Sequence, residues 1–255
     1  MVTPALSPLY RDCDFNGPLS DARAARLIDG LGPLDGAHVV DVGCGWAELL
    51  LRTLERAPTA TGFGIDLGGE ALAHGRAGAA ARGLADRVEL VEGDAGEWTR
   101  AGSGTAADVV FNIGSTHAWG GEPVEHTANA LEALSGLLRP GGRLLFGECF
   151  WLREPTGAEL AAMYDTPREQ YRTMRALVDM ALSYGFRLRE LSQASPQEWD
   201  DFENRHARGW EDWLAANPGS PDAEEVRARA DRHRVARVDG WREVMGMAYL
   251  TLVRV

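Results

Sequence analysis

The chain has 255 residues, of which 45% are hydrophobic, and a formal net charge of −12. It contains no apolar run of the length that a transmembrane helix needs, and its three cysteines are too scattered for a disulfide framework or a CxxC metal site. All 26 Lys or Arg residues are arginine, so a Schiff-base lysine is excluded. The net negative charge repels the phosphate groups of nucleic acid, which is therefore disfavoured as the main partner.

The first 150 residues alternate between helical and strand-like patterns. We predict strands at 38–42, 60–65, 87–91, 107–112 and 143–150, and helices at 20–28, 47–54, 69–82 and 124–138. Ser20 is a plausible N-cap of the first helix. Strands that alternate with helices favour a parallel sheet covered on both faces, which is a Rossmann-like α/β fold.

The pattern changes after Trp151. Helical segments are expected at about 157–184 and 197–238, with a strand at 187–191 between them and an apolar strand at 244–255. No Pro/Ser-rich linker separates the halves, so we expect one domain over 1–255. Its parts are a cofactor-binding core at about 25–150, lid or cap elements at 1–24 and about 151–240, and a last strand at 241–255.

Three acidic residues lie at the ends of three neighbouring strands of the expected sheet. Asp41 stands two residues before the glycine turn Gly43-Cys44-Gly45, Asp66 ends the next strand, and Asp94 ends the third. The carboxyl ends of parallel strands form one crevice, so these carboxylates should meet there. Asp41 suits a cationic amino-acid ligand better than a pyrophosphate, and Asp66 can accept both hydroxyls of a ribose. A turn whose third glycine is replaced by Ala47 can also be merely structural.

The string Val39-Val40-Asp41-Val42-Gly43-Cys44-Gly45 resembles the first motif of class I, Rossmann-like S-adenosylmethionine-dependent methyltransferases. Asp66, Gly93-Asp94-Ala95 and Leu138–Leu144 are similar to later landmarks of that family in order and spacing. The resemblance covers about residues 25–150 and departs at Trp46-Ala47, where many members have a small residue and glycine. It implies a seven-stranded, mostly parallel, doubly wound sheet with an antiparallel last strand, and helical cap elements after strand five and before the last strand.

The resemblance also implies S-adenosyl-L-methionine as the cofactor and S-adenosyl-L-homocysteine as its product. By this carry-over Gly43 and Gly45 line the methionine moiety, Asp66 holds the ribose, and Asp94 with Ala95 addresses the adenine. The full set of implied cofactor-binding residues is Asp41, Gly43, Cys44, Gly45, Asp66, Leu67, Asp94, Ala95 and Asn112.

The loop at 112–121 follows the fourth strand, and in this architecture it lies beside the sulfonium. With residues 15–20 and 147–151, this loop resembles a bacterial group of methyltransferases of mostly unassigned substrate. His117 is the first candidate for a general base because imidazole titrates near neutrality; alternatively, it only hydrogen-bonds the loop or the cofactor carboxylate. Glu148 could hold or deprotonate a cationic amine, or it could be a structural carboxylate.

Aromatic residues are expected around the acceptor. Phe15, Trp119 and Trp151 are expected to bind the acceptor. Trp119, Trp151 and Trp46 could stack on a planar acceptor or stabilise the positive sulfonium, although tryptophans at these positions could equally pack the cap onto the sheet. The His and Glu residues at 117–126 lack a compact metal-binding spacing, so no metal is expected.

The predicted reaction is methyl transfer to a nitrogen or oxygen of a small molecule, as in secondary metabolism. Residues 1–10 lack the features of a secretory signal, so a cytoplasmic location is expected, with no membrane partner. One alternative is methylation of tRNA or a protein side chain, which would need a basic groove beside 112–121. Others are a nicotinamide-dependent oxidoreductase, against which Asp41 and the missing third glycine argue, and a non-catalytic cofactor sensor.

Overall fold

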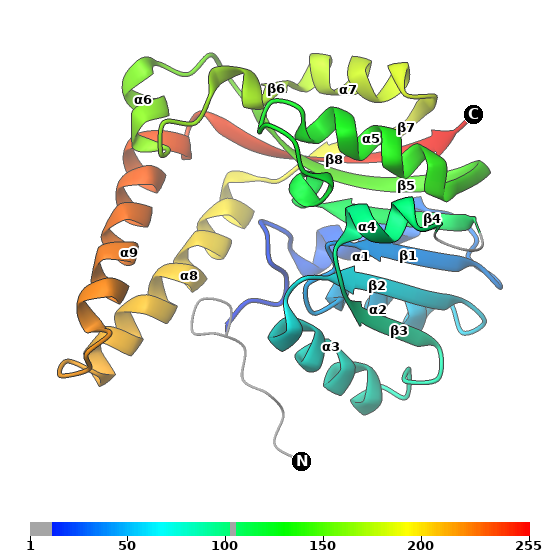
Figure 1. The fold of residues 1–255 in the computed structure, drawn as a ribbon, viewed down its shortest axis with the longest axis horizontal. Helices are drawn as coiled ribbons and strands as arrows, with labels where there is room; N and C mark the ends of the chain where they lie inside the picture. The colour runs from blue at the N-terminus through cyan, green and yellow to red at the C-terminus, as the bar shows by residue number, and fades with distance from the viewer. Residues whose placement is uncertain (1–11, 103–105) are drawn as a thin grey trace.

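The computed structural model describes residues 12–102 and 106–255 (Figure 1). Part of the expected N-terminal lid, residues 1–11, lies outside the described residues. The centre of the fold is a sheet with the strand order β3-β2-β1-β4-β5-β8-β7. Its strands are β1 (His38–Val42), β2 (Thr61–Asp66), β3 (Val88–Glu92), β4 (Ala107–Ile113), β5 (Leu138–Trp151), β7 (Phe186–Gln193) and β8 (Met245–Arg254).

The directions of the strands confirm the expected sheet. β1 to β5 pair in parallel, whereas β8 is antiparallel to both of its neighbours, β5 and β7. An eighth strand, the two-residue β6 (Arg172–Thr173), pairs with the end of β5 outside the main order. The central strands are apolar runs buried on both faces, as parallel strands between two helix layers should be.

Helices cover both faces of the sheet (Figure 1). One layer contains α1 (Asp21–Gly30), α2 (Glu48–Arg56) and α3 (Gly69–Ala81), and the other contains α4 (Ala95–Arg100), α5 (His126–Leu137) and α7 (Met174–Ser183). The helices bury apolar residues against the sheet: Leu50, Leu51 and Leu54 of α2 are each at most 1% exposed. Each side of the sheet therefore has its own hydrophobic core.

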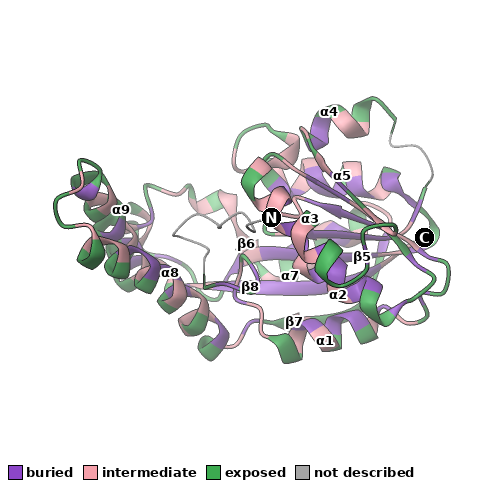
Figure 2. Ribbon diagram, turned by 90° about the horizontal axis from the view of Figure 1, so that it is seen from below, coloured by how far each residue is buried: buried purple, intermediate pink, exposed green. Residues whose placement is uncertain are grey.

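A helical hairpin projects beyond the carboxyl ends of the strands (Figure 2). It consists of α8 (Pro196–Ala216) and α9 (Ala223–Val235), which pack side by side, and a π-helical turn, η3 (Ala236–Trp241), that leads toward β8. η3 packs on α6 (Gly157–Ala162), which comes after β5. Within the residues described, no helix is both long and apolar enough to cross a bilayer.

Three elements differ from the sequence-based predictions. α4 was not predicted, although Asp94 caps it by accepting the N–H of Glu97 over 2.7 Å. β5 begins at Leu138 rather than at 143, because Leu138 already pairs with Ala107 across a register shift. The expected helical stretch 157–184 is interrupted by a 3-10 turn, η2 (Arg168–Gln170), and by β6, whose backbone bonds go to β5.

Candidate active site

The glycine turn after β1 has a conformation that requires glycine. Gly43 has a φ of +74° and Gly45 a φ of +55°, both in the left-handed region. A Cβ on Gly43 would lie 2.3 Å from the side chain of Ser115, so the space is also closed to any larger residue. Ala47 is left-handed as well, with a φ of 59°, so the position that lacks the family glycine keeps a glycine-like backbone.

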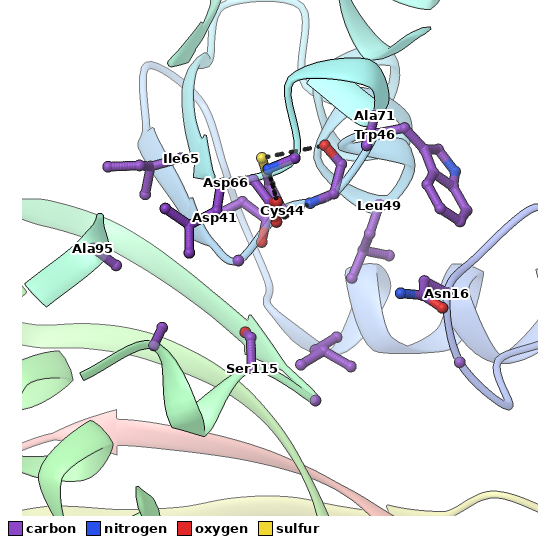
Figure 3. Close-up of a pocket in the computed structure, with 18 of the residues that line it drawn as sticks. Asn16, Asp41, Cys44, Trp46, Leu49, Ile65, Asp66, Ala71, Ala95 and Ser115 are labelled. Carbon is purple, nitrogen blue, oxygen red and sulfur yellow. Dashed lines mark hydrogen bonds between the residues drawn. The ribbon is translucent and has the colours of Figure 1, made fainter. Parts of the chain in front are cut away.

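A cavity of about 550 Å³ lies at the carboxyl ends of β1 to β4, over the glycine turn (Figure 3). Asp41, Cys44 and Asp66 gather on one side of it, and Asn16 lies on another. All of the expected cofactor-binding residues except Asn112 line this cavity. They are Asp41, Gly43, Cys44, Gly45, Asp66, Leu67, Asp94 and Ala95.

Asp66 organises the backbone around the cavity. Its Oδ2 accepts the N–H of Gly45 and its Oδ1 accepts the N–H of Gly68, each over 2.8 Å. Each carboxylate oxygen can accept a further hydrogen bond, so the group remains able to bind a ligand hydroxyl. The next residue, Leu67, lines the cavity with 70% of its surface exposed, which is unusual for a large apolar side chain.

Asp41 is a buried carboxyl group with only 7% of its surface exposed. Burial, and after it the negative charge of Asp66, raises the pKa of Asp41 to about 8. A carboxyl group in such a place is better stabilised as an anion when a cation comes close to it. The position therefore suits a ligand that carries positive charge.

Asn112 lies behind the cavity rather than in its wall. The side-chain amide donates to the carbonyl oxygen of Val42 over 3.1 Å and to Oγ of Ser115 over 2.8 Å. The Ser115 hydroxyl in turn donates to Val42 over 2.9 Å. These bonds tie the end of β4 to the start of the glycine turn, so Asn112 can act on a ligand only through the turn.

His117 lines the cavity, whereas Glu148 does not. His117 is on η1 (Thr116–Trp119), the 3-10 turn that follows β4. Glu148 is buried, and burial raises the pKa of Glu148, opposed mainly by a hydrogen bond from the Thr116 hydroxyl and by the N–H of Cys149. Glu148 accepts the N–H of Cys149 over 2.8 Å and does not line the cavity, and the choice between its two roles stays a prediction.

Phe15 is the one of the three expected acceptor-side aromatic residues that lines the cavity. Trp151 donates its indole N–H to the carbonyl oxygen of Arg168 over 2.8 Å and packs edge-on against Tyr171. Trp119 packs against the core of the α5 layer. The geometry thus favours the packing interpretation for both tryptophans.

Several cavity residues were not identified from the sequence. Tyr249 of β8 lines the cavity and donates its hydroxyl to the carbonyl oxygen of Pro18 over 3.0 Å. No local pattern in an apolar strand indicates that its tyrosine faces a segment more than 200 residues away.

Among the described residues, no group of three His, Cys, Asp or Glu side chains is placed to hold a metal ion.

Comparisons with known proteins agree with this geometry. Residues 39–142 match the sequence profile of a methyltransferase domain. The uncharacterized protein YjhP of Escherichia coli K12 is 29% identical over 240 residues, which are 94% of this chain and 93% of that protein. The ubiquinone/menaquinone biosynthesis C-methyltransferase UbiE of Paracoccus denitrificans is 36% identical over 119 residues, but these are only 47% of this chain and 45% of that enzyme.

A solved structure extends the likeness over the whole fold. It is the SAM-dependent methyltransferase of Geobacter sulfurreducens in complex with S-adenosyl-L-homocysteine. It superposes with a TM-score of 0.86 at 26% identity, and the alignment covers 97% of this chain and 96% of that one. The similarity therefore includes the helical cap as well as the sheet.

Proposed function

Because this chain belongs to the class I, Rossmann-like S-adenosylmethionine-dependent methyltransferases, we propose that it methylates a nitrogen or oxygen atom of a small molecule. The observation that carries the proposal is the cavity of about 550 Å³, in which strand-end carboxylates face a largely apolar wall. Its volume falls in the range of small-molecule sites. A role in secondary metabolism depends on the acceptor and stays a prediction.

The residues at the strand ends fit the chemical groups of the cofactor. Gly43 and Gly45 allow the backbone to come close to the methionine part, and Asp66 offers lone pairs to ribose hydroxyls. The exposed Leu67 offers an apolar surface to the adenine ring. Asp41 gains a cationic partner when the cofactor binds.

The opposite wall fits an acceptor of low charge. Phe15, Leu19 and Tyr249 supply apolar surface there and Asn16 supplies polar atoms, while His117 lines the same cavity from η1, after β4. The bound cofactor would supply an electrophilic methyl group, to which the lone pair of the acceptor would bond in line as the methyl–sulfur bond breaks and S-adenosyl-L-homocysteine leaves. The chain holds the acceptor in line and excludes water, and His117 removes the proton of the attacking N–H or O–H group.

The charges of the cavity do not favour the alternative acceptors. Among the described residues that line it, four are acidic and none is arginine, so a phosphate backbone would meet repulsion there. The same carboxylates would repel the pyrophosphate of a nicotinamide cofactor. The similarity to UbiE covers less than half of that enzyme, so a carbon acceptor is left as an outcome of the experiment.

Two measurements test the proposal in sequence. Calorimetry should show binding of S-adenosyl-L-homocysteine and no binding of NADH; the reverse result would contradict methyl transfer. Incubation with isotope-labelled S-adenosyl-L-methionine and a fractionated cell extract should then yield a small product heavier by one labelled methyl group. Label in tRNA or protein instead, or on carbon, would overturn the proposed acceptor class.

The role of His117 is tested separately once an acceptor is known. His117→Ala should lower kcat by about 100- to 10,000-fold if the imidazole removes a proton. His126→Ala is the matched control, because the ring of His126 is a neighbour of His117, with centroids 6.3 Å apart, but does not line the cavity. Unchanged turnover in His117→Ala would remove the base from the mechanism and leave methyl transfer intact.

A further inference from the structure

One wall of the cavity is formed by residues 13–20, which precede α1 and are here called the wall segment. Phe15, Asn16, Gly17 and Leu19 of this segment line the cavity. A second cavity, of about 280 Å³, lies behind it, between the segment and α8. The apolar support behind the segment is therefore incomplete, and polar contacts must contribute to holding it in place.

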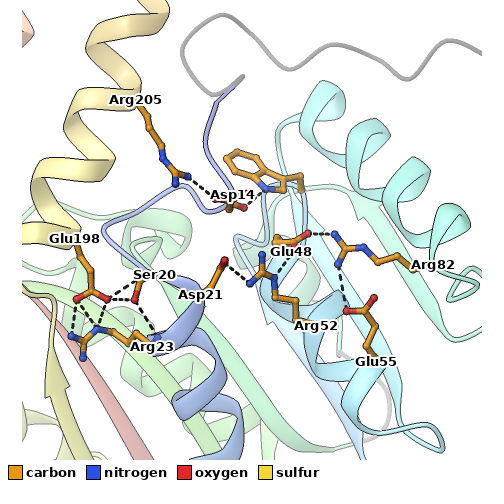
Figure 4. A network of polar contacts seen from close by, with 11 residues as sticks. Asp14, Ser20, Asp21, Arg23, Glu48, Arg52, Glu55, Arg82, Glu198 and Arg205 are labelled. Carbon is orange, nitrogen blue, oxygen red and sulfur yellow. Dashed lines mark hydrogen bonds and ion pairs between the residues drawn. The ribbon is translucent and has the colours of Figure 1, made fainter.

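The strongest of these contacts converge on Glu198, in the first turn of α8 (Figure 4). Its carboxylate accepts the Ser20 hydroxyl over 2.6 Å, and accepts two N–H groups of the Arg23 guanidinium, Nε over 2.8 Å and Nη2 over 2.7 Å. It also accepts the N–H of Ser195, which closes the capping box of α8. A single buried carboxylate thus joins the start of α1 to the start of α8.

Two further residues of α8 contact the other end of the wall segment. Arg205 donates to the carboxylate of Asp14 over 2.6 Å, and Phe202 packs against Cys13 and Trp46. Positions 198, 202 and 205 follow the spacing of one helix face. One face of α8 therefore contacts the wall segment at both ends.

The same contacts reach the glycine turn. The indole N–H of Trp46, which follows Gly45, donates to the carbonyl oxygen of Asp14 over 2.8 Å. Asp14 is thus held by Arg205 through its side chain and by Trp46 through its backbone. The wall segment lies between the cap on one side and the cofactor-facing turn on the other.

We propose that α8 acts as a strut that holds the wall segment against the glycine turn, with Glu198 and Arg205 as positioning residues for cofactor binding. This inference rests on the proposed function, because it assigns the cap a task at the same cavity. The strut explains why Glu198 stands in the first turn of α8, where its carboxylate accepts the N–H of Ser195 and the hydroxyl of Ser20 at the start of α1.

The test uses Arg205→Asp in the full chain, because loss of a partly exposed ion pair should leave the fold intact. Hydrogen exchange of the amides at 13–20 is measured without ligand, and the affinity for S-adenosyl-L-homocysteine is measured by calorimetry. We expect exchange of the segment to quicken and the affinity to fall, each by about 3- to 10-fold. The charge-swapped double variant Asp14→Arg/Arg205→Asp should return both values to within about twofold of the wild type.

Arg229→Asp is the matched control, since it removes the exposed pair with Glu225 on α9 and should change neither value. Unchanged exchange at 13–20 in Arg205→Asp would overturn the strut. Faster exchange at 13–20 with unchanged affinity for S-adenosyl-L-homocysteine would overturn the positioning role. A loss of affinity that the double variant does not restore would indicate general destabilisation instead, and would also overturn it. If the wild type binds no S-adenosyl-L-homocysteine, the proposed function fails, and the exchange data still decide whether α8 holds the segment.

Discussion

The two walls of the cavity are held together over very different distances along the chain. On the cofactor side, Asp66 bonds the turn at Gly45, only 21 positions away. On the acceptor side, Ser20 and Asp14 bond α8 across 178 and 191 positions. The cofactor wall is the side of the cavity formed by the glycine turn and the strand ends with Asp41, Asp66 and Asp94, and it forms with the parallel strands themselves. The acceptor wall is the side that contains the wall segment (13–20), and it is complete only when the cap has docked.

The difference suggests how one family can keep its cofactor while changing its acceptor. Residues at strand ends are fixed by the sheet, so substitutions in the cap leave them in place. The wall segment is held by α8 through Asp14 and Ser20 as well as by Trp46 and Tyr249, so α8 is the contact that lies farthest from it along the chain apart from β8. Variants on the two sides should therefore fail in different ways, and the following experiments measure that difference from the largest expected effect to the smallest.

Glu198→Gln should give the largest loss of stability, about 3 kcal/mol at neutral pH, because it leaves the nearly buried Arg23 guanidinium without its charged partner. Burial alone would raise the pKa of Glu198, but hydrogen bonds from Arg23, from the Ser195 N–H and from Ser20 lower it to about 2. A carboxylate whose pKa is lower in the folded state than in the unfolded state stabilises the fold fully when the pH is above the unfolded-state pKa. That stabilisation is lost as the pH falls toward the folded-state pKa. Urea unfolding measured from about pH 6 to pH 3 should thus show that the difference in free energy of unfolding between wild type and Glu198→Gln becomes smaller as the pH falls.

The control for this change is Glu225→Gln, an exposed carboxylate on α9 that should cost less than about 0.5 kcal/mol. A gap between wild type and Glu198→Gln that stays constant with pH would show that the charge of Glu198 does not stabilise the fold.

Asp66→Ala tests the other wall. It removes the acceptor of the Gly45 and Gly68 N–H groups as well as the expected partner of the ribose, so affinity for S-adenosyl-L-homocysteine should fall about 100-fold. Exchange of the amides at 13–20 should hardly change, since α8 still holds them. Asp86→Ala, on an exposed residue between α3 and β3, is the control for loss of an aspartate. Equal loosening of the wall segment in Asp66→Ala would contradict the separation of the two walls.

The cofactor wall is also the part that could be predicted from the sequence. Asp41, Asp66 and Asp94 each follow a short apolar run, and parallel strands place their carboxyl ends at one edge. The carboxylates of this side were accessible in that way, whereas the antiparallel last strand was expected only from the family resemblance. The signal is strong because every step of the inference is local in sequence.

The acceptor wall could not be predicted in the same way. Glu198 closes the capping box of α8 in the structure, and nothing local in the sequence indicates that its carboxylate also binds Arg23. Trp151 stands at the end of a strand, like the cofactor residues, yet packs under Arg168 and Tyr171. Such contacts depend on how the cap docks, which is a property of tertiary packing rather than of spacing.

Gly43→Ala should cost about 2 kcal/mol, since it forces a left-handed backbone on alanine and places a methyl group against Ser115. Thermal unfolding measures the cost, and calorimetry should show weaker binding of S-adenosyl-L-homocysteine. Gly136→Ala is the matched control, because this glycine is in α5 with nothing within 4 Å of its Cβ position, so alanine should stabilise. Equal stability of the two variants would mean that the turn can relax away from Ser115.

Asp41→Asn should give a change that depends on pH and is smallest at acidic pH, where a protonated aspartate and an asparagine are both uncharged. Because the pKa of Asp41 is raised to about 8, the folded protein keeps a proton that the unfolded chain loses near 3.8. Between these values the unfolded state binds fewer protons, so the free energy of unfolding should fall by about 1 kcal/mol per pH unit, and it should level off above the folded pKa. Asparagine cannot titrate, so the variant should lack this decline; Asp35→Asn, on an exposed residue, should retain it.

A cationic ligand facing Asp41 favours its ionised form, so binding should release part of a proton near neutral pH. Calorimetry of S-adenosyl-L-methionine in buffers of different ionisation enthalpy measures that release, which should fall in Asp41→Asn and persist in Asp35→Asn. Parallel stability curves for wild type and Asp41→Asn would mean that Asp41 is already ionised in the free protein. The Asp41 carboxylate would then be charged before the cofactor binds, and the two walls would differ only in how far apart along the chain their contacting residues lie.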